Sequence, residues 1–196
     1  MIKNKTQPHE LPSRVNDSYW LFAESPRRLR FTIEKRCYEW IDKESKKYVQ
    51  SGKIYPRDIN KEELIVPTRE PELTLRKIDI EVIDNNIRPS GKWLIYLQRN
   101  EVDETWKILS SAIRNGKLPY VAKVSTAKPN PNSTDRNSHV ICVYTPNYLF
   151  REDVRNCRRI LFEMGFKDML YYKPDIMTFN GMYRVTGSRI NHRYFG

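Results

Sequence analysis

The chain has 196 residues, of which 39% are hydrophobic and 30% charged, so it holds enough apolar residues to fold as one domain. Its 35 lysines and arginines outnumber the 24 acidic residues, and the resulting net charge of +11 favours polyanionic partners. No apolar run is long enough to cross a bilayer and the start lacks a signal-peptide core, so we expect no membrane partner.

The cysteines and histidines bear on metal binding and on location. Three of each are spread along the sequence without CxxC or HxxxH spacing, so we expect no metal site and no cofactor. Cys142 and Cys157 lie within apolar patterns and are predicted to be buried thiols. An odd number of cysteines in a chain without a signal peptide predicts a cytoplasmic location. The absence of GxxxxGKS/T and HExxH argues against P-loop and metalloprotease sites.

The first half of the chain is the harder half to interpret. Residues 1–24 are predicted to form an extended N-terminal arm, because they begin with a polar, proline-containing stretch. A helix is expected to begin after Ser25, which can act as its N-cap, and to end at Gly52. Four prolines break residues 53–90, with one strand or short helix around 73–83.

From residue 91 onward the patterns are clearer. Strands and helices alternate here in the order β-α-β-loop-β-α-β, which predicts a single α+β domain over residues 25–196, with a mostly antiparallel sheet and helices on one face. The expected strands are 92–99, 120–126, 139–145 and one within 169–185; the expected helices are 101–118 and 151–166.

Two polar residues interrupt the apolar strands around the loop 127–138. Alternation places Lys123 and Ser125 on one face of their strand and Thr126 on the other, and His139 begins the next strand. A lysine in a central strand costs desolvation energy unless it faces a partner or a wet cleft. We therefore predict that Lys123, Ser125 and Thr126 bind phosphate; the alternative is an edge-strand lysine that blocks sheet association.

Arginines of the helix 151–166 form a second candidate phosphate site. Arg155 and Arg158 lie on one stripe of this helix, apart from its apolar stripe. If the stripe borders the cleft, the guanidinium groups can clamp a phosphate; the alternative is a solvated helix face.

The C-terminal stretch interleaves aromatic and cationic residues, a composition typical of surfaces that stack bases and neutralise phosphates. Lys173 and Arg184 are expected to bind phosphate, and Tyr172 to stack on a base. Trp20 is a further stacking candidate, because no periodic pattern assigns it to a core. The alternative is that the C-terminal aromatic residues complete the core.

In combination, several blocks of the second half resemble the basophilic-leukaemia-expressed protein family, over about residues 90–185. The blocks are "GKWLIYLQRNEVDETWKILSSAIRNGKL", "AKVST", "HVICVYT" and "YKPDIMTFNGMYR". The resemblance implies a fold like that of the cap-binding translation initiation factor, a curved antiparallel sheet backed by helices. It does not transfer cap binding, because no two of the four tryptophans can be matched to the pair that sandwiches a methylated guanine.

Members of this family have also been labelled phosphothreonine lyases. The residue types allow such an enzyme, with Lys123 as base, His139 as acid, and Lys173 with Arg158 holding the phosphate. This hypothesis requires the side chains of Lys123 and His139 to leave the same face of the sheet.

Three functions remain open from the sequence. The first is binding of RNA or a nucleotide in the concavity of the sheet, and the second is phosphate elimination from a phosphorylated protein or small molecule. The third is an interaction protein whose surface is merely basic. The oligomeric state is not predicted.

Overall fold

A computed structural model describes residues 11–40, 62–63, 77–85, 87–130, 135, 137–183 and 192–196. Its strands form one sheet in the order β1-β4-β5-β3-β6-β7-β2, in which every neighbouring pair is antiparallel except β2 and β7. The strands are β1 (Trp20–Glu24), β2 (Glu62–Glu63), β3 (Gly91–Gln98), β4 (Val121–Ser125), β5 (Ser138–Thr145), β6 (Tyr171–Pro174) and β7 (Tyr194–Phe195). The helices are α1 (Arg27–Trp40), α3 (Lys77–Asp84), α4 (Val102–Arg114), α5 (Arg151–Glu163) and α6 (Asp175–Phe179).

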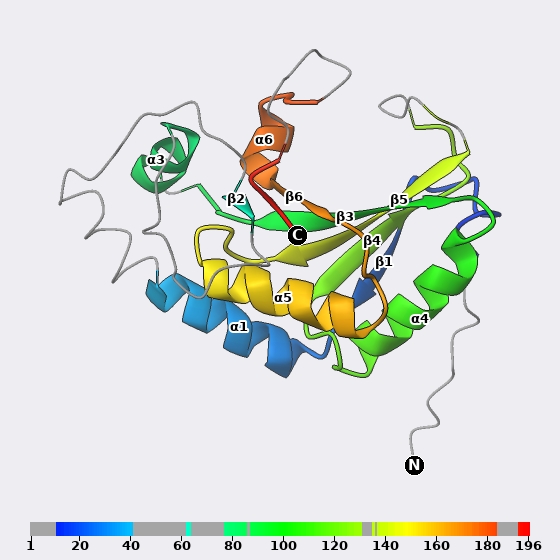
Figure 1. The fold of residues 1–196 in the computed structure, drawn as a ribbon, viewed down its shortest axis with the longest axis horizontal. Coiled ribbons are helices and arrows are strands. Elements are labelled where there is room, and N and C mark those ends of the chain that lie inside the picture. The colour runs from blue at the N-terminus through cyan, green and yellow to red at the C-terminus, as the bar shows by residue number, and fades with distance from the viewer. Residues whose placement is uncertain are drawn as a thin grey trace.

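The sheet is curved and its two faces differ. Figure 1 shows α1, α4 and α5 on one side of the sheet, whereas the short helix α6 rises from the other side, next to β6. The predicted fold class, α+β with a curved and mostly antiparallel sheet and helices on one face, is confirmed; the five-residue helix α6 is an exception that the sequence did not predict. We call the side away from α4 and α5 the open face.

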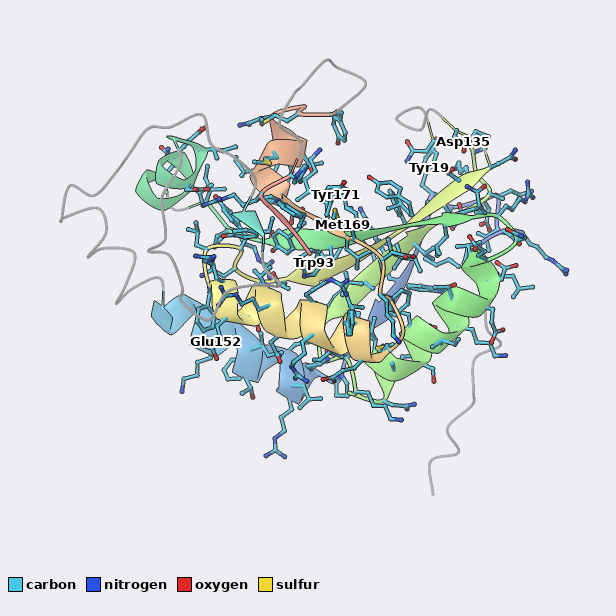
Figure 2. All side chains as sticks on the ribbon, in the orientation of Figure 1. Tyr19, Trp93, Asp135, Glu152, Met169 and Tyr171 are labelled. Carbon is cyan, nitrogen blue, oxygen red and sulfur yellow. The ribbon has the colours of Figure 1, made fainter. Side chains whose placement is uncertain are left out.

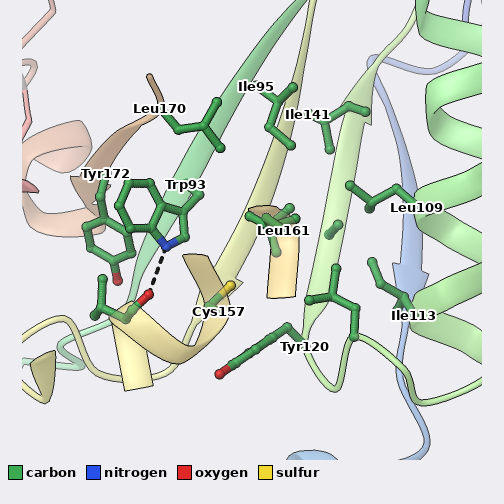
Figure 3. Packing of buried hydrophobic residues seen from close by; sticks show 14 of the residues in the cluster. Trp93, Ile95, Leu109, Ile113, Tyr120, Ile141, Cys157, Leu161, Leu170 and Tyr172 are labelled. Atoms are coloured by element: carbon green, nitrogen blue, oxygen red, sulfur yellow. Dashed lines mark hydrogen bonds between the residues drawn. The ribbon is translucent and has the colours of Figure 1, made fainter. Parts of the chain in front are cut away.

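The hydrophobic core lies between the sheet and the helices α4 and α5 (Figure 3). Trp93 of β3 is completely buried, and its indole Nε1 donates a hydrogen bond to the carbonyl of Val154 at 3.1 Å. Trp106 and Leu109 fill the space between α4 and the sheet. Cys157 of α5 is also buried, as the sequence predicted.

The end of the predicted N-terminal arm belongs to the sheet. Residues 20–24 form β1, which pairs with β4 so that Trp20 lies opposite Ser125. The segment before β1 is fixed to α4, because Ser13 donates from its amide and its hydroxyl to Asp103 at 2.9 and 2.5 Å. The hydroxyl of Thr126 also donates to the carbonyl of Ser18. These contacts hold Trp20 at a defined place on the sheet.

The structure changes two other expectations for the first half of the chain. Helix α1 begins at Arg27, but the buried hydroxyl of Ser25 has no hydrogen-bond partner among the described residues, so it does not cap the helix. The predicted end of this helix at Gly52 lies outside the described residues. A strand or a short helix was expected around residues 73–83, and the described part of this segment is helical, in α3.

A buried ion pair connects α3 to the C-terminal segment. Arg193 and Asp79 are both fully buried, and an Nη of Arg193 lies 3.4 Å from a carboxylate oxygen of Asp79. The hydroxyl of Tyr148 donates to the other carboxylate oxygen at 2.8 Å.

In the described part of the chain, no helix is long and apolar enough to span a bilayer.

Candidate functional site

The open face combines lysines with aromatic rings. Strand alternation and the registers of the sheet place these side chains on the side away from α4 and α5; Tyr171, one of them, is labelled in Figure 2. They are Trp20 and Phe22 of β1, Lys123 and Ser125 of β4, Val140, Cys142 and Tyr144 of β5, Lys92, Leu94 and Tyr96 of β3, and Tyr171 and Lys173 of β6.

Lys123 lies on β4, the second strand of the sheet, between two aromatic rings. Its Nζ is 4.0 Å from the centroid of the Trp20 ring and 5.7 Å from that of Tyr144. It forms no ion pair with the described residues. Burial, followed by the nearby charge of Lys92, lowers the pKa of Lys123. A half-buried cation held by rings alone keeps its donors available for an anion.

Lys92 is the second cation of the open face and is partly neutralised. Its Nζ forms an ion pair with Asp175 and donates to the hydroxyl of Thr178 at 3.0 Å. The same nitrogen lies 5.6 Å from the centroid of the Tyr144 ring. Lys92 and Lys123 therefore approach one tyrosine ring of β5 from the two strands on either side of it, β3 and β4.

Lys173 is the third cation of the open face, and an aromatic ring and a backbone carbonyl hold its ammonium group. Its Nζ donates to the carbonyl of Met182 at 2.6 Å and lies 4.0 Å from the centroid of the Tyr183 ring. Burial, together with the charge of Lys92, lowers the pKa of Lys173 to about 8. A positive charge at this position is therefore easily lost in mildly alkaline solution, and an anion nearby would stabilise it.

Exposed rings lie to either side of the lysines. Tyr96 is 65% exposed and Phe22 is 59% exposed. Trp20 and Tyr96 stand at the two ends of one row across β1, β4, β5 and β3. Three strand spacings separate them, or about 14 Å.

A cleft of about 380 Å³ adjoins the open face, and Tyr144 belongs to both. Asp175, Ser90 and Arg88 line one part of it, and Glu24 and Arg30 line another. Arg30 and Glu24 form an ion pair at 2.9 Å. The described residues contain no group of three or more histidine, cysteine or acidic side chains able to hold a metal ion.

The structure separates the two residues proposed for the lyase. Lys123 lies opposite Cys142, so its side chain shares the open face, whereas His139 lies opposite Leu97 and points to the helix side. His139 is 3% exposed, and its Nδ1 donates to the carbonyl of Ser125 at 2.9 Å. The two groups therefore cannot act on one carbon atom, and the lyase hypothesis built on this pair is wrong.

Three other predicted ligand-binding residues have structural roles. Arg158 is 3% exposed and donates to the backbone carbonyls of Gly196, Phe166 and Asp168 at 3.0, 2.8 and 2.9 Å. Tyr172 is completely buried, and its hydroxyl lies 2.6 Å from that of Thr145. The prediction that Arg158 binds phosphate and Tyr172 stacks on a base is therefore wrong. Thr126 is also buried, with its hydroxyl engaged by Ser18.

The other predicted residues are divided between the two sides of the sheet. Ser125 shares the open face with Lys123, and its hydroxyl accepts a hydrogen bond from the amide of Val140 at 2.9 Å. Arg155 is half-buried on α5, on the helix side. Arg184 lies outside the described residues. Of the predicted set, the open face unites Trp20, Lys123, Ser125 and Lys173.

Sequence reasoning missed several residues of this face. Lys92 and Tyr96 occur in "KWLIYLQ", where alternation alone puts them on one side of the strand. Tyr144 alternates in the same way within "HVICVYT". The missing information was the register between strands, which brings these residues next to Lys123. Asp175 carried no signal, because the helix that it begins was not predicted.

Comparisons with known proteins give one family and a limited structural likeness. The family model described as basophilic leukemia-expressed protein Bles03 matches residues 1–181, well beyond the region of the expected resemblance. Two complexes of schistosome eIF4E with 4E-BP, one with m7GpppG and one with m7GpppA, match with TM-scores of 0.39 and identities of 21% and 22%. Each match covers 55% of this chain and 59% of the eIF4E chain, less than two thirds of its length. A TM-score of 0.39 is too low to carry a conclusion about a ligand.

Proposed function

The chain belongs to the Bles03 family, and we propose that it binds single-stranded RNA, or a nucleotide with the same chemical groups, on the open face of its sheet. Phosphates lie against Lys123 and, farther across the sheet, against Lys92 on β3 and Lys173 on β6. Bases stack on the exposed rings of Tyr96 and Phe22 and on the ring of Trp20.

The position of Lys123 is the observation that carries this proposal. Lys123 lies on an internal strand, half-buried and flanked by Trp20 and Tyr144, and it forms no ion pair with the described residues, although the charge of Asp175 acts on it. Burying an ammonium group without an anion is unfavourable, so a bound phosphate would return part of the lost solvation energy. Strand β4 lies between β1 and β5, so the lysine does not guard a sheet edge.

The spacing of the rings favours an oligonucleotide over a single nucleotide. Trp20 and Tyr96 are about 14 Å apart across the sheet, a distance that one base cannot span. A strand of several nucleotides can stack on both while its backbone crosses the lysines, the arrangement typical of single-strand binding surfaces. A phosphorylated protein would use the lysines but would leave the exposed rings unexplained.

Fluorescence anisotropy of a labelled oligouridylate of about 10 nucleotides tests the proposal at low and moderate salt. We expect Lys123→Met to weaken binding about tenfold and to lower the slope of log affinity against log salt by about 0.7, the value for one lost phosphate contact on a single strand. Lys107→Met is the matched control, because Lys107 is an exposed lysine of α4 on the helix side.

The outcomes are distinct. Binding that Lys123→Met weakens and Lys107→Met leaves unchanged supports the proposal. An equal loss of RNA affinity in both variants would mean that RNA is attracted by the overall positive charge and not bound by the open face. No measurable binding of RNA at low salt would rule it out.

A further inference from the structure

Asp175 lies where the cleft meets the lysines of the open face. Its carboxylate lines the cleft together with Ser90 and Tyr144, and it holds the ammonium group of Lys92. A carboxylate beside a phosphate-binding surface opposes anion binding, because it adds a negative charge. We therefore expect Asp175 to have a role in ligand binding beside its ion pair with Lys92.

The carboxylate is held in a fixed orientation with acceptor capacity to spare. Lys92 donates to Oδ1, and the hydroxyl of Ser90 donates to Oδ2 at 2.6 Å. The backbone is fixed as well, because the amide of Asp175 donates to the carbonyl of Ser90 at 2.8 Å. An ionised carboxylate has about four acceptor positions, so about two remain for a donor in the cleft.

The neighbouring phosphate position follows from the two lysines that flank Tyr144. The Nζ atoms of Lys92 and Lys123 are 5.6 and 5.7 Å from its ring centroid, and the charge of Lys92 acts on Lys123, so a phosphate bound beside this ring lies near both ammonium groups. Tyr144 also lines the cleft. In a nucleic acid each phosphate is bonded directly to a sugar, so a phosphate at this position brings a sugar near Asp175, the ion-pair partner of Lys92.

We propose that Asp175 accepts a hydrogen bond from a ribose 2′-hydroxyl, so that the open face prefers RNA to single-stranded DNA; this inference rests on the proposed function. The 2′-hydroxyl is the group by which a protein distinguishes the two polymers at a given position. With DNA the carboxylate receives no bond and only repels the phosphates. The ion pair with Lys92 limits this repulsion without removing it.

The inference makes an unusual prediction for the removal of the carboxylate. Asp175→Ala loses the acceptor and frees the charge of Lys92, so DNA is expected to bind more tightly while the preference for RNA disappears. Loss of a hydrogen bond to a charged group corresponds to a fall of about tenfold in the RNA-to-DNA affinity ratio. A simple charge effect would strengthen both polymers equally.

The experiment compares oligouridylate, oligodeoxyuridylate and 2′-fluoro oligouridylate of equal length by anisotropy at one salt concentration. The 2′-fluoro polymer keeps the ribose-like sugar shape but has no 2′ donor, so we expect it to bind like DNA. Glu104→Ala is the charge-matched control, because Glu104 is an exposed acid of α4 on the helix side. Asp175→Leu, which is close in shape to aspartate and has no acceptor, replaces Asp175→Ala if the latter does not fold.

The results distinguish the role of Asp175 from the proposed binding of single-stranded RNA. An RNA preference that falls in the Asp175 variant and persists in Glu104→Ala supports the role of Asp175. Equal binding of RNA and DNA by the unmodified protein overturns it but leaves single-strand binding intact, as does a preference that survives in the Asp175 variant. Absence of binding to all three polymers overturns the proposed function itself.

Discussion

Arg158 gives the sharpest test of the division between the two sides of the sheet. Its guanidinium donates to three backbone carbonyls, of Gly196, Phe166 and Asp168, and so holds the end of the chain and the loop after α5 to the helix. Arg158→Met keeps much of the aliphatic length and removes every donor. We expect a large loss of stability and no change in RNA affinity per folded molecule.

The size of the expected stability loss in Arg158→Met follows from the burial of the three acceptor carbonyls. The bond to Gly196 is buried, and an unsatisfied buried carbonyl costs about 1–3 kcal/mol. The bonds to Phe166 and Asp168 are partly buried, so water replaces part of each and the loss is about 1 kcal/mol apiece. The free energy of unfolding should therefore fall by about 3–5 kcal/mol, a large share of the 5–15 kcal/mol typical of a domain.

Urea denaturation, followed by circular dichroism, measures this loss. Arg159→Met is the control at the adjacent position, where the arginine is exposed and bonds to the side chains of Glu163 and Asn156. Its expected cost is below about 1 kcal/mol. If Arg158→Met lost less than the control, or if the folded variant bound RNA about tenfold more weakly, Arg158 would belong to the ligand site after all.

Three further predictions concern other parts of the fold and site. Gly91→Ala places a Cβ 2.5 Å from the hydroxyl of Tyr172 and 2.7 Å from its ring, and should lower stability by about 1–3 kcal/mol in thermal denaturation; an unchanged melting temperature would contradict this packing. RNA binding should weaken as pH rises through about 8, because Lys173 loses its charge there, and Lys173→Met should remove that step when affinity for oligoadenylate is measured against pH. Between this folded pKa and the ordinary value of 10.5 the unfolded chain holds more protons, so Lys173 makes the free energy of unfolding rise with pH in that window. Asp79→Ala leaves the charge of Arg193 buried and should cost about 3–5 kcal/mol in urea denaturation, whereas adding Arg193→Met should recover part of the loss; a double variant no more stable than Asp79→Ala would argue against the pair.

Local patterns were sufficient for much of the fold. Helices α4 and α5 and strands β3, β4 and β5 were predicted from periodicity, because each buries one stripe or one face against a single core. Strand β7 and the parallel contact of β2 were not predicted. Each has two residues, too few for any period to appear.

The site was harder to predict because it depends on long-range register. Alternation correctly placed Lys123 and Ser125 on the same face of β4. The local sequence, however, does not show which residues of the strand after the loop 127–138 lie on that face, because this depends on the register between β4 and β5. Tyr171 and Tyr172 illustrate the same problem within one strand. Neighbouring residues point to opposite faces, so one tyrosine lies on the open face and the other in the core, and the composition cannot say which.

Arg158 was misassigned for a different reason. It follows Val154 by four positions and precedes Leu161 by three, and both of these residues face the core. Its place on the buried stripe was therefore present in the spacing, but a charged residue there was interpreted as solvent-facing. The carbonyls that receive its hydrogen bonds lie on distant parts of the chain or in loops, where no sequence pattern marks them.

Ultraviolet cross-linking of bound oligouridylate, with mass spectrometry of the cross-linked peptides, tests most directly whether the open face is the binding surface. The account predicts cross-links on Trp20, Phe22, Tyr96 and Tyr144, which belong to β1, β3 and β5 but share one face. Lys123→Met should reduce them together. Cross-links confined to exposed residues of α4 and α5, such as Phe162, would place the nucleic acid on the opposite side of the sheet and contradict the account.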